Sequence, residues 1–231
     1  MKLPAVDMPT KSDKEHKEYT FRHISYCSLF WLFIFGSVIG FILEGLWCIL
    51  KKGSWESHSS TIWGPFCIIY GVGAVSVYLA SSILKNKNIL LQFILFSVVG
   101  SLVEYFGSLL QEIVFGSKSW DYSCHFMNIG GRVSLKMALI WGVLGITVTR
   151  FVFPILATYL EKIDGKFWKI GCVVLSIFMA LNFFFSSAAV MRWRERLTDY
   201  TPPANALEQF LDKTYGDNEM QKNYPNMKFS T

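Results

Sequence analysis

Two glutamates inside long apolar stretches are the residues of this chain best suited to do chemistry. Each closes a stripe of small residues with the spacing i, i+3, i+7, which puts the members on one helical face: Ser37, Gly40 and Glu44, then Ser97, Gly100 and Glu104. A carboxylate inside a membrane costs at least ~2.5 kcal/mol to insert, so it normally faces a partner or a wet cavity. We therefore predict a function for both glutamates.

The two stripes belong to an internal repeat. Residues 37–45 read SVIGFILEG and residues 97–105 read SVVGSLVEY, which match at Ser, Val, Gly and Glu with an offset of 60 residues. Two spans separate the copies, so the repeated helices run in the same direction. Both carboxylates lie seven residues before a polar position, Lys51 or Gln111, about 10 Å below the same membrane boundary. The alternative is a similarity that reflects only the composition that membrane helices share.

Basic residues enter the membrane from the same face as the glutamates. Arg132 and Lys136 begin the fourth predicted span one helical turn apart. We predict that Arg132 pairs with Glu44 and Glu104, because an unpaired buried charge is costly. The alternative is a charged cluster that only orients the helices.

These residues belong to a chain built mainly from apolar helices. Of 231 residues, 52% are hydrophobic and 17% charged, against roughly a quarter charged in soluble domains. Several uncharged stretches reach the roughly 20 residues that cross a bilayer. We predict an all-α, polytopic membrane helical bundle in the cell membrane, made of two tandem helical hairpins and one extra helix. Its five transmembrane helices are expected at about 28–50, 65–84, 89–112, 132–153 and 168–191.

The charged residues gather outside these spans. We predict a mobile polar arm over residues 1–27, a transmembrane domain over 28–191, and a polar tail over 192–231 with a short amphipathic helix around Leu207, Phe210 and Leu211. The net charge of +5 lies mostly in the tails and connections, so nucleic-acid binding has no support. Lysines and arginines near the span ends number nine on the N-terminal face and seven on the other, which slightly favours a cytoplasmic N-terminus. The five cysteines lack metal-binding spacing, and we predict no metal or cofactor.

Two longer connections, 51–64 and 113–131, share one face of the predicted bundle and carry polar, aromatic and glycine residues. Their motifs are Gly64-Pro65 with the following Tyr70-Gly71, then Trp120-Asp121-Tyr122-Ser123 and Asn128. Convergent polar groups in a largely apolar pocket orient a small ligand. We predict that four of these side chains close a cavity over the carboxylates: Tyr70, Asp121, Tyr122 and Asn128.

Taken together, the motifs resemble the ABC-transporter type IV permease family, the CmpB-like integral membrane proteins, over roughly residues 28–150. The positions that carry the resemblance include Gly40, Glu44, Gly64, Pro65, Tyr70, Gly71, Gly73, Glu104, Tyr105, Trp120, Asp121, Tyr122, Ser123, Asn128, Gly131 and Arg132. Ile68 departs from the pattern, because the family usually has proline there. The resemblance implies a transport permease of bacterial membranes. The predicted substrate-binding residues are Glu44, Tyr70, Glu104, Tyr105, Trp120, Asp121, Tyr122, Asn128 and Arg132.

Three classes of function follow. The leading one is a transporter permease or substrate-capture subunit for an unknown small molecule, either as a homo-oligomer or with a separate ATPase subunit, since the chain has no G-x-x-x-x-G-K-[ST] phosphate loop. The second is a non-transporting membrane scaffold or regulator. The third is an intramembrane enzyme with Glu44 or Glu104 as general base, which no Ser-His or Cys-His arrangement supports.

Overall fold

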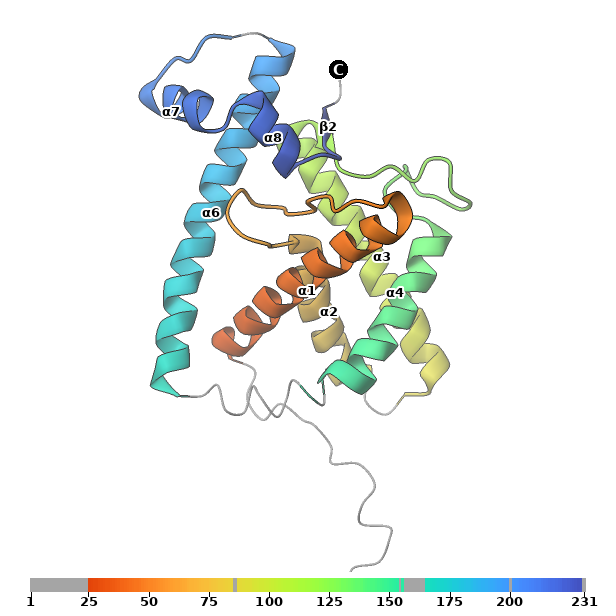
Figure 1. Ribbon diagram of the computed structural model, residues 1–231. Coiled ribbons are helices and arrows are strands. Elements are labelled where there is room, and N and C mark those ends of the chain that lie inside the picture. The colour runs from red at the N-terminus through yellow and green to blue at the C-terminus, as the bar shows by residue number, and fades with distance from the viewer. Residues whose placement is uncertain (1–24, 85–86, 154, 156–164, 200, 230–231) are drawn as a thin grey trace, which may run out of the picture.

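A computed structural model describes residues 25–84, 87–153, 155, 165–199 and 201–229 of the chain (Figure 1). The elements in chain order are α1 (Tyr26–Lys52), α2 (Ile68–Leu84), α3 (Ile89–Phe115), β1 (Ser117–Lys118), α4 (Leu135–Thr147), the π-helix η2 (Val148–Val152), α6 (Lys166–Thr198), α7 (Ala206–Thr214), α8 (Asp217–Asn223) and β2 (Lys228–Phe229). The polar arm predicted over residues 1–27 lies outside the described residues as far as residue 24.

The all-α membrane architecture predicted from composition is confirmed. Within the described ranges, four helices are long and apolar enough to cross a membrane: α1, α3, α4 continued by η2, and α6. Large apolar side chains point outward from them, including Leu50, Ile113 and Phe151, as a lipid solvent requires. The remaining span, the second of the five predicted, corresponds to the shorter α2, with 17 residues.

Capping residues near the predicted span boundaries mark where several of the long helices begin and end. Ser25, Asn88 and Ser134 each accept a hydrogen bond from a backbone N–H three residues later, at the starts of α1, α3 and α4. Gly53 and Gly116 end α1 and α3 in the left-handed conformation, which glycine adopts without a steric cost. Local sequence therefore sets the helix lengths.

The two hairpins pack their helices in the same way. In the second helix of each hairpin, one glycine lies so close to the first helix that a methyl group in its place would collide with a serine and a phenylalanine. These contacts are Gly71 with Ser37 and Phe33, and Gly142 with Ser97 and Phe93. Each serine hydroxyl donates to the backbone carbonyl of that phenylalanine, at 2.8 Å in the first hairpin and 2.9 Å in the second. The repeat seen in the sequence is thus also present in the packing.

A second pair of glycines admits two aromatic rings between the hairpins. The Tyr70 ring lies on Gly40 of α1, and the Trp141 ring lies on Gly100 of α3. Tyr70 and Trp141 each stand one residue before the hairpin glycine, so they are equivalent in the repeat. Their ring centroids are 6.0 Å apart. The two rings therefore meet where one hairpin contacts the other.

The connection between α1 and α2 is held against the middle of α6. Asn182, which is fully buried sixteen residues into α6, donates from Nδ2 to the Trp63 carbonyl at 2.6 Å and accepts from the Trp63 N–H at 3.2 Å. Ser186 Oγ accepts from the Ile62 N–H at 2.9 Å. Figure 1 shows this connection at about half the height of α6. Backbone that dips to this depth must be paired inside the protein.

The dipping connection also explains the difference between the predicted and observed second span. The prediction begins at residue 65, whereas α2 begins at Ile68. Residues 60–67 are apolar enough to resemble a helix, but they form a loop whose polar groups bond to one another, with the Ser60 N–H donating to the Phe66 carbonyl at 2.8 Å. The α2 helix is short because this loop, bonded to the middle of α6, takes the place of its first turns.

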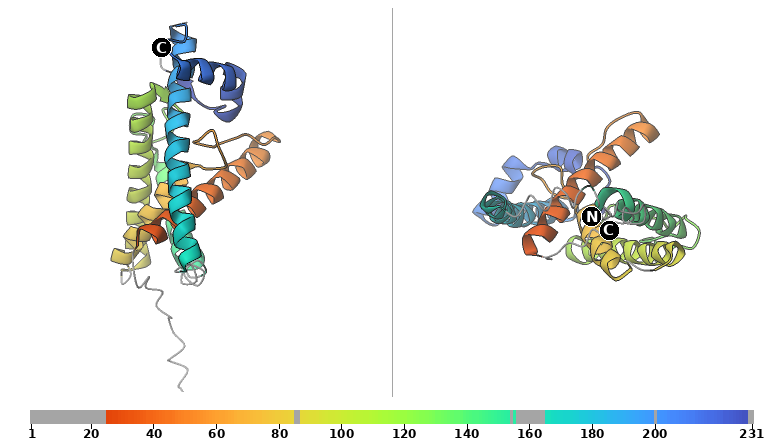
Figure 2. Two further views of the ribbon diagram at one scale, coloured as in Figure 1. Left: turned by 90° about the vertical axis from the view of Figure 1, so that its left-hand side faces the viewer. Right: turned by 90° about the horizontal axis from the view of Figure 1, so that it is seen from below.

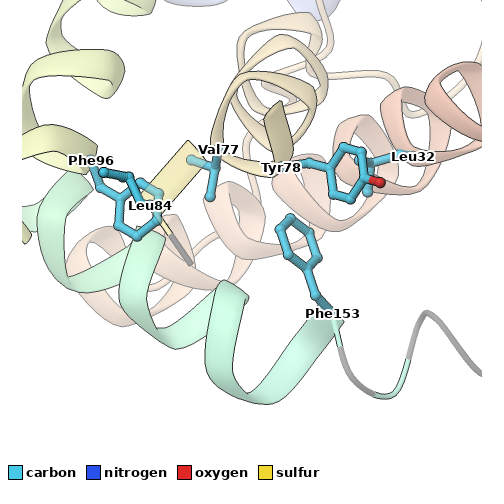
Figure 3. Close-up of a cluster of buried hydrophobic side chains, with 6 residues drawn as sticks. All are labelled: Leu32, Val77, Tyr78, Leu84, Phe96 and Phe153. Carbon is cyan, nitrogen blue, oxygen red and sulfur yellow. The ribbon is translucent and has the colours of Figure 1, made fainter. Parts of the chain in front are cut away.

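An apolar cluster closes the end of the bundle where α2 ends and α3 begins (Figure 3). It joins residues from α1, α2 and α3 with the helical residue that follows η2: Leu32, Val77, Tyr78, Leu84, Phe96 and Phe153. The Tyr78 and Phe153 rings meet edge to face at 5.6 Å. Figure 2 shows that α1 tilts away from α3 and α6 toward the opposite end of the bundle. At that end the C-terminal tail supplies the packing contacts.

The C-terminal tail folds back on the end of α6, where the segment predicted as an amphipathic helix forms α7. Apolar side chains of the tail and of the end of α6 form one cluster, which Ile62 of the first connecting loop and Phe115 at the end of α3 border. Its members are Ala189, Val190, Trp193, Leu211, Met220 and Tyr224. The buried Arg192 and its neighbour Arg196 bond to Asp212 of α7 at 2.9 Å and 2.5 Å. Strand β2 pairs antiparallel with β1, next to the end of α3. We call residues 201–229 the tail clamp.

The packing of the hairpin glycines predicts a sharp contrast between alanine substitutions. Gly100→Ala should destabilise the protein by roughly 1–3 kcal/mol, because the new methyl group collides with Trp141. Gly171→Ala in α6 is the matched control, because its methyl group would only touch Trp31 at 3.4 Å. It should be neutral or stabilising by up to about 1 kcal/mol. Thermal unfolding in detergent measures both, and equal behaviour would refute the close contact.

The tail clamp should loosen in acid. The hydrogen bond from Arg192 holds the pKa of the Asp212 carboxyl below its usual value, with a further contribution from Arg196. A lowered pKa stabilises the fold above the ordinary value of about 3.9 and stops doing so as the pH falls through the folded value. Hydrogen exchange over residues 206–223, corrected for intrinsic rates, should therefore accelerate between pH 7 and pH 3.

At pH 7, Asp212→Asn should reproduce this loosening, whereas Asp199→Asn, at an exposed position after α6, should not. Unchanged protection in Asp212→Asn at pH 7 would mean that apolar packing alone holds the clamp.

Candidate functional site

A cluster of two carboxylates and three aromatic side chains lies where the hairpins meet. The Tyr70 hydroxyl donates to Glu44 Oε1 at 2.5 Å. The Trp141 and Tyr122 side chains lie beside the Glu104 carboxyl group. Glu44 and Glu104 are thus neighbours in one cluster, with Tyr70 and Tyr122 beside them. We call Glu44, Tyr70, Glu104, Tyr122 and Trp141 the carboxylate cluster.

Glu104 is the deepest member of the cluster. It is 6% exposed, and its Oε2 atom has no hydrogen-bond partner among the residues that the structure describes. Glu44 is half-buried on the tilted α1. A buried carboxylate oxygen without a donor is costly, and such atoms in native proteins call for an explanation. The free oxygen marks the point of the cluster at which a further group could bind.

The fold brings each cluster residue in from a different segment. Glu44 and Glu104 occupy equivalent positions of the repeat on α1 and α3, Tyr70 lies in the first turn of α2, and Trp141 lies on α4. Tyr122 reaches the cluster from the loop after β1, where its N–H donates to the Gly131 carbonyl at 2.7 Å. The site therefore depends on both hairpins and on one loop.

Three other predicted site residues form bonds within that loop. Asp121 accepts from the Ser123 N–H at 2.9 Å, and the Trp120 indole donates to the Arg132 carbonyl at 3.0 Å. The Asn128 amide donates to two loop carbonyls at 3.0 Å and accepts from the Gly131 N–H at 3.1 Å. Short polar side chains favour such local bonds because they substitute for backbone pairing in a turn. Their polar groups shape the loop that carries Tyr122.

The pairing predicted for Arg132 is wrong. Its guanidinium bonds to Glu112 and, at 3.2 Å, to the Ser108 hydroxyl, and it lies 5.9 Å from the centroid of the Tyr105 ring. Glu112 is two helical turns beyond Glu104 on the same face of α3, nearer to the loop that ends at Arg132. The arginine thus finds a carboxylate near the helix end, and Tyr105 belongs with this pair. Lys136 is exposed.

Two residues escaped the sequence analysis. Glu112 lies eight residues after Glu104, and this helical spacing was the available signal that it competes for Arg132. Trp141 stands next to Gly142 in the motif of α4, but an intramembrane tryptophan is more often a packing residue, so its type alone does not point to a site. Only its contact with Gly100 places it beside Glu104.

A double-mutant cycle separates the two possible partners of Arg132. Arg132→Gln and Glu112→Gln should be non-additive, because the two side chains bond to each other. Arg132→Gln and Glu104→Gln should be additive. Thermal unfolding of the four proteins of each cycle in detergent gives both values. A larger coupling to Glu104 than to Glu112 would restore the pairing that the sequence suggested.

Comparison with known proteins gives one match. No curated protein and no solved structure is similar to this chain. Residues 31–187, which include all five members of the carboxylate cluster, match the family described as "Putative ABC-transporter type IV". The match covers more than half of the chain and agrees with the resemblance found in its motifs. The chain is a membrane protein and belongs to this ABC-transporter-related family.

Proposed function

We propose that this chain is the membrane subunit of a transporter, a permease or a substrate-capture subunit, that crosses the cell membrane several times and binds a small molecule at the carboxylate cluster. The family and the long apolar helices support the general class. The observation that carries the binding site is Glu104, a carboxylate that is 6% exposed and whose Oε2 atom has no hydrogen-bond partner among the described residues.

The position of the cluster between two repeated units supports a transport role. Transporters built from internal repeats bind substrate near the middle of the membrane at the interface between the repeats. Here each hairpin supplies one carboxylate and one aromatic ring, so a movement of one hairpin against the other changes the site. The short α2, whose first turn carries Tyr70, begins level with the middle of α6.

We propose that an ATPase subunit supplies the energy for transport. This sequence has no phosphate-binding loop of the G-x-x-x-x-G-K-[ST] type, which ATP-driven transport requires. The family description supports an ATPase subunit as the partner.

The proposal predicts a ligand that depends on Glu104. Small molecules extracted from the full-length protein, purified in detergent from its native membrane, should include one that is depleted at least about tenfold in Glu104→Gln. Glu219→Gln, which alters an exposed glutamate of α8, is the matched control and should keep the ligand. Mass spectrometry of the extracts measures both.

Two results would contradict the proposal. Equal amounts of every small molecule in wild type and in a folded Glu104→Gln variant would remove the site. The second result is that no specific molecule co-purifies with the wild type and that Glu104→Gln is more stable than the wild type. This would favour a non-transporting membrane scaffold, because removal of a buried charge would then be the only effect of the substitution.

A further inference from the structure

The charges of the carboxylate cluster restrict the kind of ligand it can take. Neither Glu44 nor Glu104 forms an ion pair with a lysine, arginine or histidine in the described part of the chain, whereas Glu112 is paired with both Arg132 and Lys118. The bonded or neighbouring side chains are the neutral Tyr70, Tyr122 and Trp141. An anion bound beside the two carboxyl groups would find no positive side chain to pair with, whereas a cation would supply the missing positive charge.

The walls of the cluster are aromatic. Tyr70 and Trp141 lie with their ring centroids 6.0 Å apart, and Tyr122 adds a third ring from the loop. Trp141 is 6% exposed and lies along the Gly100 backbone, so its ring is fixed in place. Aromatic faces attract alkylated ammonium ions, and tryptophan does so most strongly.

The donor set suits an organic cation better than a metal ion. Among the described residues, no group of three or more His, Cys, Asp or Glu side chains could hold a metal ion. Calcium takes six to eight oxygen ligands, and zinc takes four nitrogen, sulfur or oxygen ligands. Two carboxylates inside aromatic walls provide too few ligands for either ion, but they provide charge and ring faces for an ammonium group.

We propose that the carboxylate cluster binds a substituted ammonium ion, with its positive charge against the free Oε2 of Glu104 and its alkyl groups against Trp141 and Tyr70. This inference rests on the proposed function and names the substrate class of the same site. Glu44, fixed by the Tyr70 hydroxyl, supplies the second negative charge from the other hairpin.

Direct binding of defined probes to the purified full-length protein tests this assignment. Tetramethylammonium, choline and benzyltrimethylammonium should include at least one binder by isothermal titration calorimetry. If choline binds, its uncharged isostere 3,3-dimethylbutan-1-ol should bind at least about tenfold more weakly, because only the charge differs. Glu104→Gln should weaken the binding by about tenfold or more, and Trp141→Phe by about threefold.

Two further variants guard against a folding defect. Glu104→Asp keeps the charge and should keep binding, and Glu219→Gln should match the wild type. Equal binding of the charged and uncharged probes, binding that survives in Glu104→Gln, or displacement of the probe by equimolar Ca²⁺ would overturn the ammonium assignment.

The proposed function can survive the failure of this inference. A co-purified neutral or anionic molecule that disappears in Glu104→Gln, with no binding of any ammonium probe, would overturn only the substrate class. If no molecule co-purifies with the protein and no ammonium probe binds to it, the proposed site itself is overturned.

Discussion

The arrangement of this protein depends on the two hydrogen bonds between Asn182 and the backbone of Trp63. Inside a membrane a free peptide group has no water to bond, so a loop can reach this depth only if the protein satisfies it. Asn182 does so with both ends of its amide. By fixing the loop it fixes where α2 begins, and with it the position of Tyr70 and the donor that holds Glu44.

Two acidic residues of α3 face opposite electrostatic conditions. Glu112 is next to the loop and is bonded to Arg132, so its charge is compensated. Glu104, two turns deeper, has only neutral donors and keeps one oxygen free. The more deeply buried of the two carboxyl groups is thus the one that has no basic partner and keeps an unbonded oxygen. For this reason Glu104 rather than Arg132 is the centre of the proposed site.

The helical framework could be predicted from the sequence because it follows from local patterns. Apolar length gave the spans, and the cap residues Ser25, Asn88 and Ser134 set their starts. The start of α2 was misjudged, because hydropathy does not distinguish an apolar loop from a helix. The tail clamp depends on contacts between residues far apart in the chain, such as Trp63 Nε1 with the Tyr215 hydroxyl at 2.9 Å, which no local pattern encodes.

The candidate site was predictable only in part, for the same reason. The repeat indicated that Glu44 and Glu104 are equivalent, and Tyr70 and Tyr122 were among the residues selected. The partner of Arg132 depends on how the loop before α4 folds, and Asp121 and Asn128 take part in that folding. Residue type alone could not separate the side chains that shape the loop from those that reach the carboxylates.

The tail clamp sets the order in which parts of the protein can pack during synthesis. Residues 201–229 are synthesised after all the long helices, yet they bring together the loop of the first hairpin, the end of α3 and the end of α6. Until residues 201–229 have been synthesised, Trp193 and its apolar neighbours lack the tail side chains that bury them, and strand β1 lacks its partner β2. The long helices can therefore pair before this face of the protein closes.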